Sequence, residues 1–131
     1  MARILLVEDE PNISAIILFK LRREGHEVDH VETVAAARPA LGGHDLVVLD
    51  SSLPGEDAIG LLAEMHGALP TLVMTESRDE TTPDVARAAG AAAVVRKPFK
   101  PTVLARLVAE LTRKGDEGHS DTRPVQELMA P

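Results

Sequence analysis

Asp45-Leu46-Val47-Val48-Leu49-Asp50 is the stretch of this sequence that decides the fold. Its four aliphatic residues form a short continuous apolar run, which is typical of a strand buried on both faces, as the strands of parallel sheets are. The run ends on the carboxylate of Asp50, and one such acid alone is often only a turn residue. Whether Asp50 is more than a turn residue depends on which residues follow the other apolar runs of the chain.

Three further apolar runs also end on polar or charged side chains. They are residues 4–7, which precede Glu8 and Asp9, residues 72–74, which precede Thr75, and residues 93–96, which precede Lys97. The carboxyl ends of parallel strands share one edge of the sheet, and ligands of open α/β proteins bind at that edge. We therefore expect these side chains to converge with Asp50 on one site.

The order of apolar runs and helix-like segments predicts the fold class. Five strands are expected at residues 3–8, 28–31, 45–50, 69–75 and 92–96, and five helices at 11–24, 33–41, 57–66, 83–89 and 101–113. Strict alternation of this kind is typical of a doubly wound, five-stranded parallel α/β sheet. Residues 1–113 should form this domain. The polar, aperiodic segment 114–131 is expected to be a disordered tail.

Composition narrows the function. The 131 residues suffice for one domain, and a content of 44% hydrophobic but only 2% aromatic residues predicts an aliphatic core. A net charge of −7 without a basic block argues against direct DNA binding. The chain has no cysteine, no signal-like segment and no apolar run of about 18–20 residues, so we expect a cytoplasmic protein without membrane contact.

The residues expected at the shared edge suit phosphoryl transfer. Glu8, Asp9 and Asp50 offer the hard oxygen ligands that Mg²⁺ prefers. A carboxylate beside such an ion can attack phosphorus and form an aspartyl phosphate. Lys97 would supply positive charge and Thr75 a hydroxyl donor for the phosphoryl oxygens.

These stretches resemble the receiver domain of two-component response regulators. The matching segments are Leu5-Leu6-Val7-Glu8-Asp9-Glu10-Pro11, Leu46-Val47-Val48-Leu49-Asp50 with Leu53-Pro54-Gly55, Thr75, and Lys97-Pro98-Phe99. The resemblance extends over residues 2–113 and implies the flavodoxin-like receiver fold. It also implies a phosphoacceptor signalling domain that catalyses only its own phosphorylation and dephosphorylation.

The resemblance assigns roles to the residues of the site. Asp50 would accept a phosphoryl group from a histidine kinase or a histidine phosphotransfer protein, Lys97 would contact that group, and the Lys97–Pro98 peptide bond would be cis. The implied Mg²⁺ ligands are Asp9, Asp50 and the backbone carbonyl of Ser52, with Glu8 contacting the ion through water. Phosphorylation would switch contacts with a downstream protein that the sequence does not identify.

Two positions depart from the pattern of the family. Glu76 follows Thr75 where a small residue usually leaves the phosphate accessible, and we expect it to point outward and to restrict access. Val94 lies three residues before Lys97, where the family usually has an aromatic switch residue. A valine cannot report phosphorylation by a large side-chain rotation, so the signal should travel by another route.

The first helix carries a candidate docking surface. At about 100° per residue, residues 13, 16, 17 and 21 fall on one face, which we expect to be the core. Leu18 and Phe19 fall roughly opposite, and an exposed apolar pair there suits contact with a kinase or a phosphotransfer helix. Two exposed apolar side chains are also ordinary on a protein surface.

Alternative functions remain at this point. An aspartate-nucleophile phosphatase would need a second acid two residues after Asp50, where the chain has Ser52. A receiver-like module that interacts without phosphorylation would be compatible with Glu76 and Val94. The chain could also be the N-terminal receiver of a longer multidomain regulator, although we expect a stand-alone regulator because residues 114–131 do not begin a new pattern.

Overall fold

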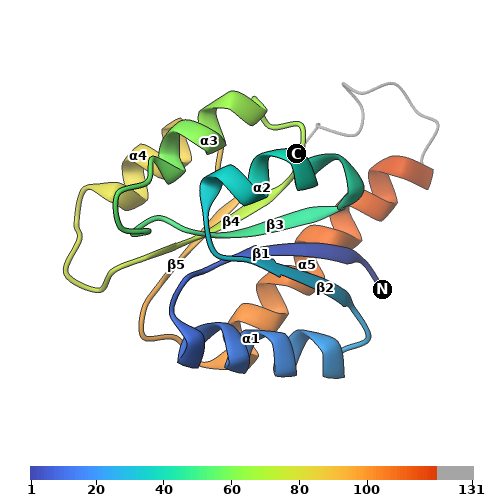
Figure 1. Cartoon of the computed structure of the whole chain (residues 1–131). Coiled ribbons are helices and arrows are strands. Elements are labelled where there is room, and N and C mark those ends of the chain that lie inside the picture. Colours follow the sequence, from blue (N-terminus) through green and yellow to red (C-terminus); the bar gives the residue numbers. More distant parts are fainter. Residues whose placement is uncertain (121–131) are drawn as a thin grey trace.

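The computed structural model describes residues 1–120, with side chains up to residue 113. The elements follow one another as β1 (Arg3–Val7), α1 (Pro11–Arg23), β2 (Glu27–Val31), α2 (Val34–Ala40), the 3-10 turn η1 (Leu41–Gly43), β3 (Leu46–Asp50), α3 (Ala58–Met65), β4 (Thr71–Thr75), α4 (Thr82–Ala88), β5 (Ala93–Arg96) and α5 (Pro101–Ser120). All strand pairs are parallel, and the order across the sheet is β2-β1-β3-β4-β5 (Figure 1). The predicted doubly wound fold is confirmed.

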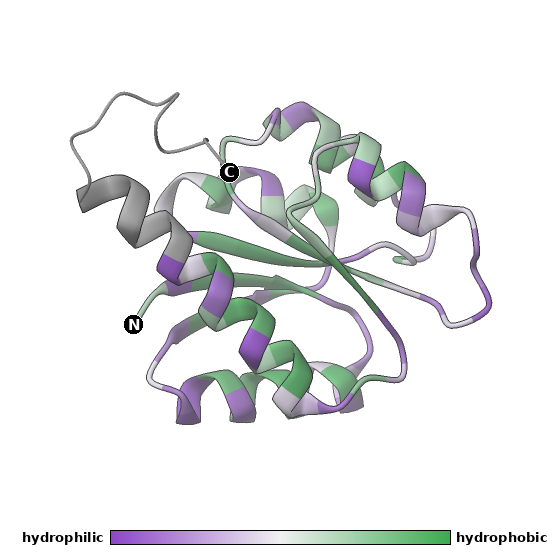
Figure 2. Ribbon diagram, turned by 180° about the vertical axis from the view of Figure 1, so that it is seen from behind, coloured by the Kyte–Doolittle hydropathy of each residue, from purple (hydrophilic) through white to green (hydrophobic). Residues whose placement is uncertain are grey.

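The helices form one layer on each face of the sheet. Figure 1 shows α1 and α5 on one face and α2, α3 and α4 on the other. The three central strands are therefore covered on both sides, and every residue of β3 and β4 is buried. In Figure 2 these strands are hydrophobic along most of their length, while the exposed faces of the helices are hydrophilic.

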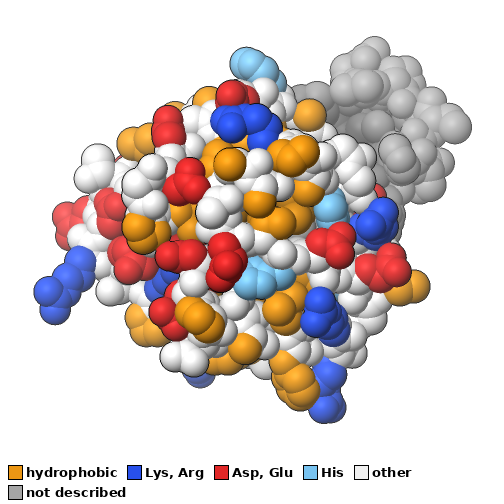
Figure 3. Space-filling model, viewed as in Figure 1, with side chains coloured by type: hydrophobic (Ala, Val, Ile, Leu, Met, Phe, Trp, Pro, Cys, Tyr) orange, Lys and Arg blue, Asp and Glu red, His pale blue; other side chains and the backbone are white. Residues whose placement is uncertain are grey.

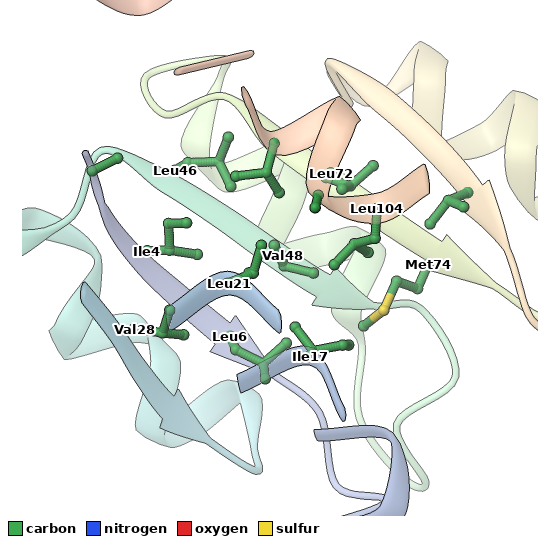
Figure 4. Packing of buried hydrophobic residues seen from close by; sticks show 14 residues of the cluster. Ile4, Leu6, Ile17, Leu21, Val28, Leu46, Val48, Leu72, Met74 and Leu104 are labelled. Carbon is green, nitrogen blue, oxygen red and sulfur yellow. The ribbon is translucent and has the colours of Figure 1, made fainter. Parts of the chain in front are cut away.

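Two aliphatic clusters fill the spaces between the layers. The cluster beneath α1 and α5 is drawn in Figure 4 and includes Ile17 and Leu21 of α1 and Leu104 of α5, packed on alternate residues of the strands. The cluster beneath α2, α3 and α4 takes the intervening strand residues, such as Leu5 and Val47. Because successive side chains of a strand point to opposite faces of the sheet, each apolar run contributes residues to both clusters.

Helix α1 is rotated relative to the prediction. Its buried residues are Ser14, Ile17 and Leu21, whereas the side chain of Ile16 is 50% exposed, so its assignment to the core was wrong. Leu18 is half-buried against the core, which corrects the expectation that it is exposed. The buried face includes a serine, Ser14, whose hydroxyl donates to the carbonyl of Pro11, and hydropathy alone does not identify such a core position.

Local sequence explains how two helices end. Gly25 has a φ of 95° directly after α1, a conformation that favours glycine. In α2, Pro39 lies inside the last turn, and the chain continues from Ala40 into η1. Proline lacks the N–H of a helical hydrogen bond, so its position explains why α2 ends within one residue of it.

Helix α5 is longer than predicted. It continues to Ser120 rather than ending at residue 113, so residues 114–120 of the expected tail are helical. The rest of that tail, residues 121–131, lies outside the described residues. Within the described part of the chain, no helix combines the length and the apolar character needed to cross a membrane.

Candidate functional site

The strand ends converge on one pocket, as the sequence predicts. It has a volume of about 610 Å³ and lies at the carboxyl edge of the sheet, with Glu8, Asp9, Asp50 and Lys97 among its lining residues. Figure 3 shows acidic side chains gathered on the side of the molecule where the loops after β3 and β4 emerge. Residues far apart in the sequence therefore share one site.

Sheet register places the nucleophile candidate and the lysine. Asp50 is the last residue of β3, pairs in register with Met74 of β4, and is 1% exposed. The backbone N–H of Lys97 donates to the carbonyl of Thr75 at 2.8 Å, directly after the last register pair of β4 and β5. The peptide bond from Lys97 to Pro98 is cis, as the resemblance implies.

Lys97 is the cationic centre of the pocket. Its Nζ lies 2.9 Å from Glu8 Oε1, 3.2 Å from Asp50 Oδ1 and 3.9 Å from Glu76 Oε2. Burial alone would lower the pKa of Lys97, but the hydrogen bond to Glu8 and the charge of Asp50 outweigh burial and raise it. The lysine is therefore held in its charged form.

One oxygen of Asp50 is fixed by several donors. Oδ1 accepts from the Ser52 hydroxyl at 2.9 Å and from the Ser52 backbone N–H at 3.1 Å, in addition to its ion pair with Lys97. A carboxylate with a firmly held Oδ1 has a defined orientation. Its second oxygen, Oδ2, is therefore the candidate nucleophilic atom.

Three carboxylates form a candidate cation site. Glu8, Asp9 and Asp50 each offer an oxygen, and these three oxygens lie within 4.8 Å of one another. Burial raises the pKa of Glu8 to about 7, since Asp50 adds to the effect of burial and Lys97 opposes it only in part. Three acids at such short range repel one another, and a hard divalent cation is the partner that relieves this repulsion.

The Thr75 hydroxyl is a second indication that a ligand binds at this site. Its Oγ1 is buried and has no hydrogen-bond partner among the residues that the structure describes. Thr75 does not itself line the pocket, but it directly precedes Glu76, which does. Buried hydroxyls are normally paired, so an unpaired donor next to the pocket is a candidate contact for a bound group. An oxygen-rich ligand such as a phosphoryl group satisfies this description.

The two departures from the family pattern lie in different places. Glu76 lines the pocket beside Lys97, and its side chain is 54% exposed, so it points partly outward as expected. Val94 is half-buried and packs against the core beneath α2, α3 and α4. The valine is therefore not among the residues that line the pocket.

The candidate docking pair lies apart from the pocket-lining residues. Leu18 and Phe19 line a separate surface depression on α1 with Ala15, Arg22 and Arg23. The ring of Phe19 is 66% exposed, and the Arg23 guanidinium lies 5.8 Å from its centroid. The expectation of an exposed apolar side chain on α1 thus holds for Phe19.

Sequence reasoning missed several residues at the site. The pocket has an apolar wall that includes Ile13 and Ile16 of α1 and Phe99. His30, at the end of β2, places Nε2 2.7 Å from the backbone carbonyl of Glu8. The sequence contained a signal only for the wall, because two isoleucines three residues apart lie in the helix that begins just after the acids. Nothing in the sequence indicated that His30 contacts Glu8.

Comparison with known proteins identifies the family of this chain. The family model for the response regulator receiver domain matches residues 4–109. The transcriptional regulatory protein TcrA of Mycobacterium tuberculosis is 36% identical over 121 residues, which cover 86% of this chain and 47% of TcrA. The transcriptional regulatory protein BasR of Escherichia coli is 36% identical over 126 residues, which cover 91% and 56%. The chain thus spans about half the length of these curated relatives.

Solved structures show the same architecture. NtrX of Brucella abortus superimposes with a TM-score of 0.83 and 29% identity over 90% of this chain and 28% of NtrX. The BeF3-activated DrrB receiver domain gives a TM-score of 0.78 and 25% identity over 86% of this chain and 98% of that domain. With its parallel five-stranded sheet and the matched residues 4–109, this chain belongs to the receiver domain family of two-component response regulators.

Proposed function

We propose that this receiver accepts a phosphoryl group on Asp50 from a histidine kinase or a histidine phosphotransfer protein. The observation that carries the proposal is the arrangement around Asp50. A buried carboxylate at a strand end contacts the ammonium of Lys97 and shares a pocket with two further acids. This set provides a nucleophile, a counter-charge and oxygen ligands within one site.

The transfer follows from the roles of the individual atoms. Asp50 Oδ2 attacks the phosphorus while Oδ1 remains held by Ser52 and Lys97. The P–N bond of the phosphohistidine breaks, its electron pair goes to the ring nitrogen, and an acyl phosphate forms on Asp50. Lys97 and the Thr75 hydroxyl then contact the phosphoryl oxygens, which gives the orphan donor of Thr75 its partner.

The residues of the pocket fit a bound Mg²⁺. Asp9, Asp50 and the backbone carbonyl of Ser52 would hold the ion, and Glu8 would contact it through water. When bound, Mg²⁺ neutralises charge on the phosphoryl oxygens and the carboxylates. Without the ion, Lys97 partly neutralises the negative charge of Glu8 and Asp50 and keeps Asp50 in place.

Phosphorylation is proposed to switch contacts with a downstream protein. Candidate contacts with the phosphodonor lie on α1, where Phe19 is exposed and Leu18 is half-buried. The cytoplasmic location and the absence of direct DNA binding, both expected from the sequence, belong to the same proposal. The names of the longer relatives refer to transcriptional regulation by those proteins.

A direct test uses Mg²⁺ and beryllofluoride, which mimics the phosphoryl group. The wild-type chain should bind beryllofluoride only when Mg²⁺ is present, and acetyl phosphate should add one phosphoryl group, which intact-protein mass spectrometry detects. Asp50→Asn should remove both responses while circular dichroism stays unchanged. Phosphorylation of Asp50→Asn at the wild-type rate would contradict the assignment.

The same experiment tests the first of two alternatives. A folded wild-type chain that neither binds beryllofluoride nor accepts phosphate would favour a phosphorylation-independent interaction module, for which Glu76 beside Lys97 is the motivating observation. The chain as the receiver part of a longer regulator is motivated by the greater length of its relatives. Phosphorylation on Asp50 is expected in that case too.

A further inference from the structure

The charges around the pocket are strongly unbalanced. Its lining includes one ammonium group, that of Lys97, and five carboxylates, those of Glu8, Asp9, Glu10, Asp50 and Glu76. Even with one divalent cation bound, the acids exceed the positive charges. Any phosphodonor must therefore enter a negatively charged pocket, and the charge that the donor carries affects its rate of reaction.

Glu76 differs from the other four acids in its position. It follows β4, whereas the others follow β1 or end β3, and it begins the loop that leads to α4. Its Oε2 lies 3.9 Å from Lys97 Nζ, and its side chain is 54% exposed, while Glu8 and Asp50 are buried. Glu76 thus places a negative charge where the pocket opens to solvent, within reach of the lysine that binds the phosphoryl group.

The geometry of the reaction brings the leaving group toward this opening. The attacking and leaving atoms lie roughly in line across the phosphorus, so the leaving group faces away from Asp50 and toward solvent. Acetyl phosphate breaks its P–O bond and releases acetate, an anion. Phosphoramidate, protonated on nitrogen, breaks its P–N bond and releases neutral ammonia, and a protonated phosphoimidazole likewise releases neutral imidazole.

We propose that Glu76 is a specificity-determining residue that selects phosphodonors by the charge of their leaving group. The inference rests on the proposed phosphorylation of Asp50. The Glu76 carboxylate repels a departing anion and attracts a cationic nitrogen. It also forms an ion pair with Lys97, which an incoming phosphoryl group would replace. Donors whose leaving nitrogen is cationic before the P–N bond breaks, which include protonated phosphohistidine, are favoured over acyl phosphates.

The test compares two small donors and two variants. Phosphorylation rates are measured with acetyl phosphate and with phosphoramidate, with Mg²⁺ present, for the wild type, Glu76→Gln and Glu80→Gln. Glu80 is exposed in the same loop but does not line the pocket, so its variant controls for net charge. Glutamine keeps the size of the Glu76 side chain and removes only the charge.

The expected result is a change in preference rather than a general gain. Glu76→Gln should raise the rate with acetyl phosphate about threefold, as removal of one charge several ångströms away in a hydrated site predicts, and should leave or lower the rate with phosphoramidate. The effect should shrink as ionic strength rises. Glu80→Gln should change both rates by the same small factor.

Two other outcomes have distinct meanings. Equal changes with both donors, or the same change in Glu80→Gln, would overturn the role of Glu76 while leaving phosphorylation of Asp50 intact. If neither donor phosphorylates the wild type and beryllofluoride does not bind, the proposed function itself fails, and the inference about Glu76 fails with it.

Discussion

Two buried threonine hydroxyls on β4 differ in their partners. Thr71 Oγ1 donates to the carbonyl of Leu69 at 3.1 Å, whereas Thr75 Oγ1 is among the buried groups without a partner in the described chain. Both side chains are fully buried. A comparison of the two separates the structural use of a hydroxyl from its use in binding.

We expect Thr75→Val to leave the free energy of unfolding unchanged or to raise it by up to about 1 kcal/mol, because an unsatisfied buried hydroxyl is replaced by a methyl group. Thr71→Val should lower it by about 1 kcal/mol, since a hydrogen bond is lost. Urea denaturation measures both. Thr75→Val should also weaken beryllofluoride binding, and equal destabilisation by the two variants would mean that the Thr75 hydroxyl is already paired in solution.

Residues whose position follows from the ends of strands could be predicted. Asp50 and Thr75 end the buried strands β3 and β4, Lys97 follows the edge strand β5, and parallel pairing brings such positions to one edge. The contact of His30 with the Glu8 carbonyl could not be predicted, because it depends on the direction of a ring at the end of an edge strand.

Helix α1 shows how far periodicity determines a packed face. The period correctly placed Ile17 and Leu21 in the core, but Ser14 rather than Ile16 completes that face. The exact rotation of α1 depends on how it packs between β2 and α5, and this information lies in other elements. As a result Ile16 lines the pocket, which a helical wheel alone does not reveal.

The docking proposal is best tested with Phe19 rather than Leu18. Phe19→Glu should change the free energy of unfolding by no more than about 0.5 kcal/mol because the ring is exposed. Leu18→Glu should cost more, because Leu18 packs against the core and a buried charge is unfavourable. Phe19→Glu should slow phosphotransfer from a histidine phosphotransfer protein or kinase, measured with radiolabelled donor, and leave the rate with acetyl phosphate unchanged.

A matched control for this variant is Val85→Glu. Val85 is 45% exposed on α4, which covers the opposite face of the sheet. This variant introduces the same charge far from α1 and should not slow phosphotransfer. If both variants slow the protein donor equally, the effect arises from net charge and not from docking on α1.

The stability of the whole molecule should depend on divalent cations. A ligand that binds only the folded chain stabilises it by about 2.7 kcal/mol at one hundred times its dissociation constant. The carboxylate oxygens of Glu8, Asp9 and Asp50 come together only in the fold. Mg²⁺ should therefore raise the melting temperature by several degrees, in scanning calorimetry against EDTA at equal ionic strength.

Asp9→Asn provides the control for this effect. Asp9 is more exposed than Glu8 and Asp50, so the substitution should leave the fold intact. It should remove most of the stabilisation by Mg²⁺. An equal rise in melting temperature in this variant would show that the ion binds elsewhere on the acidic surface.

The parts of the site come from positions 8 to 97 and meet only through the order of the strands in the sheet. Among the strands that the structure describes, β5 comes last in the sequence and Lys97 follows it, so a growing polypeptide has no counter-charge for Asp50 until β5 is in place. Fragments that end before β5 would contain Asp50 but not the complete pocket. A phosphoryl group on Asp50, as proposed, would therefore mark molecules whose sheet has assembled through β5, and chains that are unfolded or cleaved before β5 would not carry it.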